Sequence, residues 1–454
     1  MGTHKHFLLS SNRWYSAATE YALRVCEHLH GQGHIVRIYS HAESPILAKG
    51  KALGMETQVL ALRKSNGRAL GPFGLVSLVV SLYRLVSDRH VSTTGSTASK
   101  VYIWVLEGHE HALVSLLRTV FSSLRRNSVL VRLRMQDRFD GGGIFGALVA
   151  RGTDHLVFPS EYARGRFFEG RSDLAAAYGD KVTVQYFCKD FAPELTSSGV
   201  SNAKPHDVFD LIGRNLNSFT FVAVARFDPV KGIALLIEAF AEFARIRICT
   251  GETGGRRLQL VIIGRSENIK VESLWQHAAG ILGSQRREGS CYVAASPNAD
   301  VSVILVDEIV SALPELLRRS DCAVISSLGS EVICRTAVEF LQIGLPIVST
   351  AVGSLPETIG PELGESDTSG CGFYAAVDPP GRQHVVAELT SALARAYAAI
   401  TAQQSESARN ESSHKTLNER CRARGIEFGL AGFKPLVDRV KADGTSGIDA
   451  KSDR

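Results

Sequence analysis

CAVISSLGSEVICRTAVEFLQIGLPIVST, residues 322–350, combines two apolar runs of strand length with one helical pattern between them. The runs Cys322–Ser326 and Pro346–Thr350 predict buried strands. The apolar spacing of Thr336–Ile343 predicts a helix that ends at Gly344. A strand, a crossover helix and a second strand form the unit from which parallel sheets are built.

The same alternation continues through most of the chain. The second half has further predicted strands at Thr220–Ala225, Leu258–Ile263 and Ser302–Val306, with a helix at Ile233–Arg245. The first half has predicted strands at His6–Ser11, Ile35–Tyr39, Thr57–Leu62, Val101–Leu106, Val129–Leu133 and His155–Pro159, and helices at Ala17–Gly31, Leu75–Leu85, Ala112–Leu124 and from Glu161. We therefore expect an α/β protein with two Rossmann-like, doubly wound parallel-sheet domains facing a cleft.

The length of 454 residues is enough for two such cores. We predict a first domain over 1–195, a polar linker over 196–217 and a second domain over 218–400. Residues 401–444 are expected to form a polar excursion and a closing helix, and 445–454 a disordered tail.

The composition favours a cytosolic protein. Eight cysteines are scattered without a C-x-x-C pair, and the N-terminus lacks the apolar stretch of a signal peptide.

Charge is unevenly distributed along the chain. Residues 1–200 hold 24 basic against 16 acidic residues, whereas 201–454 hold 27 against 30. The first half thus suits an anionic partner, such as a phospholipid surface or a phosphorylated acceptor, or has a solvated basic face. The uncharged run Ala69–Tyr83 predicts a buried or membrane-touching helix. Nucleic acid is not expected as a partner, because no arginine cluster is interleaved with aromatic residues.

The segment FVAVARFDPVKG, residues 221–232, places Arg226 and Lys231 in the loop after a predicted strand. Such loops lie at the carboxyl edge of a doubly wound sheet, where ligands bind. Two cations beside a helix start can hold a diphosphate without a metal. The alternative is that both are solvated loop residues.

Two glutamates accompany the predicted helix at 336–343. Glu339 lies among apolar residues, where a carboxylate needs a partner such as the hydroxyls of a ribose, unless it faces solvent. Glu331 lies in the preceding loop, near anything bound at the helix N-terminus.

These segments resemble the nucleotide-binding half of retaining GT-B glycosyltransferases, specifically family 4. The resemblance covers 218–380, through ARFDPVKGIALLIEAF, LQLVIIG, LPELLRRSDCAVISS, GLPIVSTAVGSLPETI and GCGFYAAVDPPG. RWYSAATEYALRVCEHLHGQGHIVRIY, and the part from VRLRMQDRF to LVFPSEYARGRF, fit the acceptor half of the family. The resemblance implies a nucleotide-diphosphate sugar as substrate, with no cofactor and no metal.

The resemblance also implies roles for single residues. Arg226 and Lys231 match the diphosphate-binding pair of the family. Glu331 matches the first glutamate of its E-x7-E motif, which contacts the donor sugar, and Glu339 matches the second, which holds the ribose. His109 is the best match for the histidine that reaches the sugar from the first domain.

The chain departs from the family at several positions. Its first loop, Ser10 to Trp14, replaces a glycine-rich loop and offers Arg13 and Trp14 on the acceptor side. Val-Ile-Cys-Arg follows Glu331 instead of a glycine-rich run, so Cys334 and Arg335 are expected to shape the donor pocket. The basic run LVRLRMQDR, 130–138, is interpreted as a strand edge with a solvated face, and His111 as a weaker substitute for His109.

The sequence therefore predicts a cytoplasmic, metal-independent retaining glycosyltransferase of the hexosyltransferase type. Its expected catalytic residues are Glu331, His109, Arg226 and Lys231. The acceptor would be a hydroxyl in polysaccharide or lipid-linked, lipopolysaccharide-type glycan synthesis, with peripheral contact to the inner face of a membrane. Two alternatives remain: a nucleotide-sugar epimerase of GT-B architecture, and a catalytically silent sugar-nucleotide-binding scaffold.

Overall fold

The structure is a computed structural model that describes residues 4–13, 16–60, 72–87, 101–135, 143–186, 217–308, 310, 313–329, 331–363, 370–378, 381–407 and 416–429. The chain divides into two compact units between Lys189 and Asp190. Unit 1 contains the described residues from 4 to 186, and unit 2 those from 217 to 429. The predicted linker, 196–217, lies outside the described residues except for Asn217, and so does the predicted tail.

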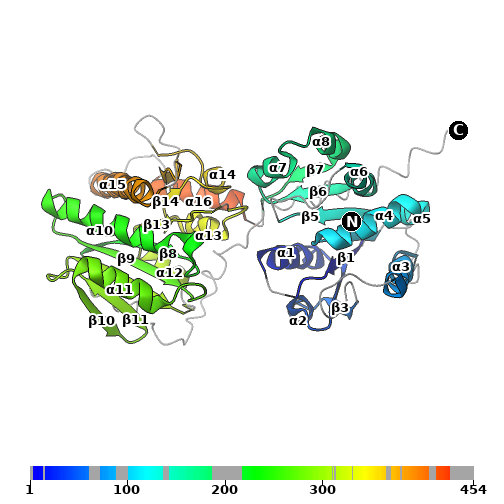
Figure 1. Ribbon diagram of the computed structural model, residues 1–454, viewed down its shortest axis with the longest axis horizontal. Coiled ribbons are helices and arrows are strands. Elements are labelled where there is room, and N and C mark those ends of the chain that lie inside the picture. Colours follow the sequence, from blue (N-terminus) through cyan, green and yellow to red (C-terminus); the bar gives the residue numbers. More distant parts are fainter. Residues whose placement is uncertain are drawn as a thin grey trace. The chain divides into compact units, whose positions relative to one another are not determined.

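Unit 1 is built on a seven-stranded parallel sheet (Figure 1). Its strands are β1 (Lys5–Ser10), β2 (Ile35–Ser40), β3 (Glu56–Val59), β4 (Val101–Val105), β5 (Ser128–Leu133), β6 (His155–Phe158) and β7 (Val182–Val184). Their order is β3-β2-β1-β4-β5-β6-β7, so the direction of winding changes between β1 and β4. In doubly wound sheets, ligands bind beyond the carboxyl ends of the strands at such a point.

The helices of unit 1 are α1 (Ala17–Gly31), α2 (Pro45–Ala52), α3 (Pro72–Ser87), α4 (Gly108–Val120), α5 (Ser122–Asn127), α6 (Gly143–Gly152), α7 (Glu161–Phe168) and α8 (Ser172–Tyr178). α1 starts where predicted, because the Ser16 hydroxyl accepts from the Thr19 N–H and caps the helix. The single helix predicted over 112–124 is wrong. Phe121 is extended there and separates α4 from α5, in a stretch of β-branched and serine residues with low helix propensity.

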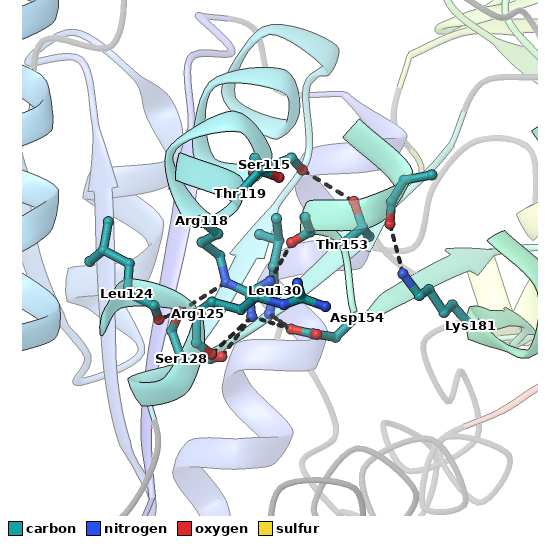
Figure 2. A network of polar contacts seen from close by, with 12 residues as sticks. Ser115, Arg118, Thr119, Leu124, Arg125, Ser128, Leu130, Thr153, Asp154 and Lys181 are labelled. Carbon is teal, nitrogen blue, oxygen red and sulfur yellow. Dashed lines mark hydrogen bonds and ion pairs between the residues drawn. The ribbon is translucent and has the colours of Figure 1, made fainter. Parts of the chain in front are cut away.

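The helices α3, α4 and α5 cover one face of the unit 1 sheet. Leu78 and Leu82 of α3, Val114 of α4 and Leu124 of α5 pack in one cluster with sheet residues such as Ile103. At the start of β5, this layer is held by Arg118, which is 1% exposed (Figure 2).

The Arg118 guanidinium lies among backbone and side-chain oxygens. Its Nη2 contacts Asp154 Oδ2 at 2.6 Å and donates to the Ser128 carbonyl at 2.8 Å, and its Nη1 donates to the Gly152 carbonyl. Asp154 in turn accepts from the Leu130 N–H at 2.8 Å. The buried charge is therefore paired and hydrogen-bonded, as burial of an ion requires.

Unit 2 has an eight-stranded sheet in the order β10-β11-β12-β9-β8-β13-β14-β15. The strands are β8 (Ser218–Val224), β9 (Arg257–Gly264), β10 (Ser284–Glu288), β11 (Cys291–Ala295), β12 (Val301–Asp307), β13 (Cys322–Ile325), β14 (Ile347–Thr350) and β15 (Gly372–Ala375). β11 pairs antiparallel with both β10 and β12, and the other neighbouring strands pair in parallel. The predicted fold class is confirmed, although the sequence did not predict the β10–β11 hairpin.

The helices of unit 2 are α10 (Ile233–Cys249), α11 (Val271–Leu282), α12 (Leu313–Arg318), α13 (Arg335–Ile343), α14 (Leu355–Ile359), α15 (Arg382–Ser407) and α16 (Leu417–Glu427). Residues 401–407, predicted as polar excursion, continue α15. Within the described part of the chain, α15 is the one helix long and apolar enough to cross a bilayer. It lies beside α10, and its Leu389, Leu393 and Ala396 belong to the core of unit 2 (Figure 1).

Candidate functional site

The candidate donor site of unit 2 lies where the neighbouring parallel strands β8 and β13 end. In the loop after β8, the Asp228 carboxylate accepts from the Val230 N–H at 2.9 Å and caps a short 3-10 helix, Pro229–Lys231. Gly232 follows with a φ of 62°, and a Cβ at this position would lie 2.2 Å from the Ser326 carbonyl oxygen. Only glycine therefore allows this loop to approach the end of β13 so closely.

Lys231 and Glu331 form an ion pair in this site between Nζ and Oε1. The Ser327 hydroxyl donates to the same glutamate oxygen at 2.6 Å. The side chains of Lys231 and Glu331 are 22% and 15% exposed, so solvent screens the pair less than it screens a pair on the open surface. The fold thus brings together two predicted site residues that are 100 positions apart in the chain.

The backbone of Glu331 is held by the loop between β14 and α14. The Ser354 N–H donates to the Glu331 carbonyl at 2.7 Å. Gly353 has a φ of 60°, and a Cβ there would lie 2.4 Å from both the backbone N and O of Glu331. Gly353 therefore positions Glu331 without touching its carboxylate.

The N-terminus of α13 opens onto the same place. Cys334 is its N-cap residue and makes no capping side-chain hydrogen bond. The first turn contains Arg335 and no acidic residue, so no carboxylate within the helix offsets the positive end of its dipole. A helix end of this kind attracts an anionic group such as a phosphate.

Charged groups surround the Cys334 thiol. Burial raises the pKa of this thiol to about 12, and Glu331, Lys231 and Glu339 act on it electrostatically. Glu339 is half-buried, one turn into α13, and Arg335 is exposed. Four of the predicted donor-binding residues therefore lie close enough to influence one another electrostatically: Lys231, Glu331, Cys334 and Glu339. Arg335 is exposed next to Cys334.

Arg226 has a different partner. Its Nη1 pairs with Glu267 Oε2 in the loop after β9, and the two side chains are 57% and 47% exposed. In the same loop, Asn268 donates to Asp228 at 2.5 Å, and the hydrogen bonds from Val230 and Asn268 lower the pKa of Asp228. The structure thus places Arg226 in the same loop as Lys231 but pairs it with Glu267 and not with Glu331.

Sequence reasoning missed Ser327, Gly353 and Glu267 as partners of the predicted residues. They lie in loops after three different strands, and only the sheet order brings those loops to one edge.

A hollow of about 470 Å³ adjoins the candidate donor site of unit 2. It lies between the N-terminal ends of α10 and α15, and Gly232, Leu328, Val377 and Arg382 contribute to its mostly apolar wall. Lys231 does not line it, so the hollow and the ion pair are separate features.

In unit 1, the two predicted histidines lie in the first turn of α4. His109 is half-buried, and its Nε2 has no hydrogen-bond partner among the described residues. His111 is 6% exposed, and its Nε2 lies 2.8 Å from the Thr153 hydroxyl. Burial and the nearby Arg132 and Arg134 lower the pKa of His111 well below its usual range. His111 therefore holds α4 to the end of α6, and His109 remains the candidate.

The loop after β1 is tied to α4 by Glu107. The Glu107 carboxylate accepts from the Ser10 hydroxyl at 3.0 Å and from the Ser11 N–H at 3.2 Å. Burial, together with the charge of Glu110, raises the pKa of Glu107 to about 7. Arg13 lies half-buried further along this loop, and Trp14 lies outside the described residues.

The interpretation of 130–138 as a solvated strand edge is wrong for Arg132 and Arg134, which are 3% and 5% exposed. Arg132 has the parity of Leu130 in β5, so it lies on the sheet face that α3, α4 and α5 cover. Arg134 follows the end of the strand, and its guanidinium lies 4.4 Å from the centre of the Phe167 ring of α7. In the described part of unit 1, Nε and Nη1 of Arg132 and both carboxylate oxygens of Glu110 have no hydrogen-bond partner. A cluster of buried charge therefore lies near the ends of β4 and β5, where sequence reasoning expected a surface.

Part of the chain matches a known protein family. Residues 209–373, within unit 2, match the family model of Glycosyl transferases group 1. No curated protein matches the chain significantly. A Rickettsia africae glycosyltransferase has a similar fold, with a TM-score of 0.65 and 13% identity over 97% of this chain and 99% of that one.

Two further solved structures are similar. Anabaena Alr3699/HepE in complex with UDP has a TM-score of 0.61 and 13% identity over 97% of this chain and 100% of that one. Sucrose-phosphate synthase from Thermosynechococcus elongatus has a TM-score of 0.59 and 13% identity over 98% of this chain and 100% of that one. The family match and the shared fold together identify the protein as a glycosyltransferase with the GT-B fold, whose unit 2 carries the group 1 domain.

Proposed function

We propose that this glycosyltransferase is metal-independent and retaining, and that it moves a sugar from a nucleotide-diphosphate sugar to an acceptor hydroxyl. The observation that carries the proposal is the position of Lys231 next to Glu331 and the open N-terminus of α13. A fixed ammonium group and helix-end N–H groups form a site for a diphosphate. The Anabaena relative in fold was crystallised with UDP.

In the proposed reaction, the bond between the anomeric carbon and the diphosphate oxygen breaks. The acceptor oxygen bonds to the same face of the sugar, and its proton passes to the departing phosphate. Negative charge develops on that phosphate, and Lys231 and the N–H groups of α13 stabilise it. Arg226 reaches the diphosphate only after it leaves Glu267, an exchange between exposed groups that costs little.

The glutamates have separate roles in this proposal. Glu331 pairs with Lys231 and Ser327 before substrate arrives. When the diphosphate takes over Lys231, the Glu331 carboxylate becomes available to the hydroxyls of the donor sugar. Glu339, further along α13, accepts from the ribose hydroxyls, and Cys334 contributes packing and helix-end amides.

Unit 1 provides the acceptor side in this proposal. Its buried charges at Arg132 and Glu110, and His109 with an unpartnered Nε2 among the described residues, suit a polyhydroxylated acceptor. We place the reaction in polysaccharide or lipid-linked glycan synthesis, in the cytoplasm at the inner face of a membrane.

Calorimetric titration with UDP, GDP and ADP tests the donor site. The nucleotide that binds wild type should bind Lys231→Ala roughly tenfold to a hundredfold more weakly, since one charge-assisted hydrogen bond is lost. Arg245→Ala, which removes an exposed cation paired with Glu242 on α10, is the matched control and should bind normally. Equal affinity in wild type and Lys231→Ala would overturn the diphosphate assignment.

Product analysis tests the reaction itself. Transfer to an acceptor should continue in excess EDTA and keep the anomeric configuration of the donor. Absolute dependence on Mn²⁺ or Mg²⁺ would contradict the metal-independent mechanism. Release of free nucleotide with an epimerised sugar, or nucleotide binding without turnover, would replace the proposal with the epimerase or the silent scaffold.

A further inference from the structure

The outer surface of α3 is apolar although it faces solvent. Val76, Val80 and Tyr83 are 62%, 43% and 44% exposed, and they follow one another at helical spacing. The opposite side of the helix, Leu78 and Leu82, is buried in the core of unit 1. Core packing therefore accounts for one side of α3 and leaves the other unexplained.

Exposed apolar residues continue onto the neighbouring helices. Ile144, Phe145 and Leu148 of α6 are 84%, 49% and 37% exposed. Val120 at the end of α4 and Phe121 directly after it are 73% and 42% exposed. α3 contacts α5, and α4 contacts both α5 and α6 (Figure 1). The Thr119 hydroxyl at the end of α4 donates to the Leu148 carbonyl at 3.4 Å. The exposed side chains thus belong to one layer of adjacent helices, here called the α3–α6 surface.

The exposed charged side chains of the α3–α6 surface are all positive. Arg84, Arg125, Arg126 and Arg151 are exposed on α3, α5 and α6. The one acidic residue in the sequences of these four helices is Glu110, which is 1% exposed. Large exposed apolar patches mark interaction sites, and a basic rim around one matches an anionic partner.

We propose that the α3–α6 surface docks onto an anionic phospholipid bilayer, with Ile144, Phe145 and Val76 entering the interface and the arginines contacting lipid phosphates. A second copy of the chain suits this surface less well, because two such faces would bring arginines of like charge together. This surface is formed by helices of unit 1, whereas the donor site belongs to unit 2. Vesicle binding therefore tests the surface without any assay of sugar transfer.

Cosedimentation of the full chain with vesicles tests the proposal. We expect binding to phosphatidylcholine vesicles that contain phosphatidylglycerol, and weaker binding to phosphatidylcholine alone. Ile144→Ser/Phe145→Ser should lower the partition coefficient for both kinds of vesicle. Arg125→Gln/Arg126→Gln should lower it about tenfold or more for anionic vesicles only, and should reduce its salt dependence.

Matched controls separate the surface from general effects. Ile246→Ser/Ile248→Ser removes two isoleucines of unit 2 that are each 40% exposed, and Arg164→Gln/Arg166→Gln removes two exposed arginines of α7. Both controls should bind vesicles like wild type, and circular dichroism should show all variants folded. The proposal is overturned if wild type does not bind anionic vesicles, if the controls lose as much binding, or if Ile144→Ser/Phe145→Ser instead abolishes self-association in sedimentation experiments.

Discussion

Lys231 and Glu331 hold each other across two adjacent strand ends, with Ser327 donating to the same carboxylate oxygen. The lysine that would bind a diphosphate is therefore already neutralised by an acid of the same site. Donor binding must share or replace this ion pair, so the carboxylate and the diphosphate compete for one cation.

Glu331→Gln should separate nucleotide binding from transfer. Without the negative charge, Lys231 attracts the diphosphate more strongly, so the affinity for free nucleotide should rise by ~0.5–1 kcal/mol. Transfer should fall at least about tenfold, because the contact with the donor sugar loses its charge. Calorimetry and initial rates measure the two effects. Glu242→Gln, in an exposed pair on α10, should change neither, and a loss of nucleotide affinity in Glu331→Gln would contradict the competition.

Gly353→Ala should damage the site through the Glu331 backbone. The added methyl would meet Glu331 N and O at 2.4 Å and would also be strained by the φ of 60°. Gly251→Ala is the matched control, because Gly251 has a φ of 70° and no atom lies within 4 Å of its Cβ position. The control should lose roughly 1 kcal/mol of unfolding free energy, and Gly353→Ala more, together with transfer activity. Equal effects in both variants would mean that the contact with Glu331 is unimportant.

Arg118→Met should strongly destabilise unit 1. The change leaves the carbonyls of Ser128 and Gly152 and the Asp154 carboxylate without their buried partner. A loss of roughly 3–5 kcal/mol in the free energy of unfolding is expected from urea denaturation. Arg245→Met, whose side chain is 63% exposed, should lose less than about 1 kcal/mol. A similar small loss for Arg118→Met would show that the network in Figure 2 contributes little.

Glu107 should make unit 1 less stable as the pH rises. Its pKa is raised from 4.5 to about 7 in the folded protein, so the folded state binds more protons than the unfolded chain between these values. The free energy of unfolding should therefore fall across this pH window, by about 1–3 kcal/mol. Urea denaturation at several pH values should show a flatter profile for Glu107→Gln. Glu43→Gln, an exposed site of unit 1, should keep the wild-type profile.

Much of the fold could be predicted from local pattern. α1 has the predicted bounds, and the eleven strands that the sequence predicted lie within a few residues of the predicted runs, whereas the parallel edge strands β7 and β15 were not predicted. Strand β10 was missed because its sequence, SQRRE, is polar and mostly exposed, so it has no apolar pattern to detect. The break at Phe121 was missed because the helical spacing of apolar residues continues through this position, although the backbone of Phe121 is extended.

The sequence by itself determined two α/β units, because the apolar periodicity of each strand and helix depends only on the residues of that segment. It also placed Lys231 and Glu331 in loops that follow strands, and Glu339 in the helix after the Glu331 loop, since these positions follow directly from the strand and helix boundaries. Tertiary structure decided which charges meet. β8 lies beside β13 and β9 in the sheet, so Lys231 meets Glu331 while Arg226 turns to Glu267. The burial of Arg132 likewise depends on the helices that cover β5. The sequence of a strand does not show which helices will cover it, so this burial could not be predicted.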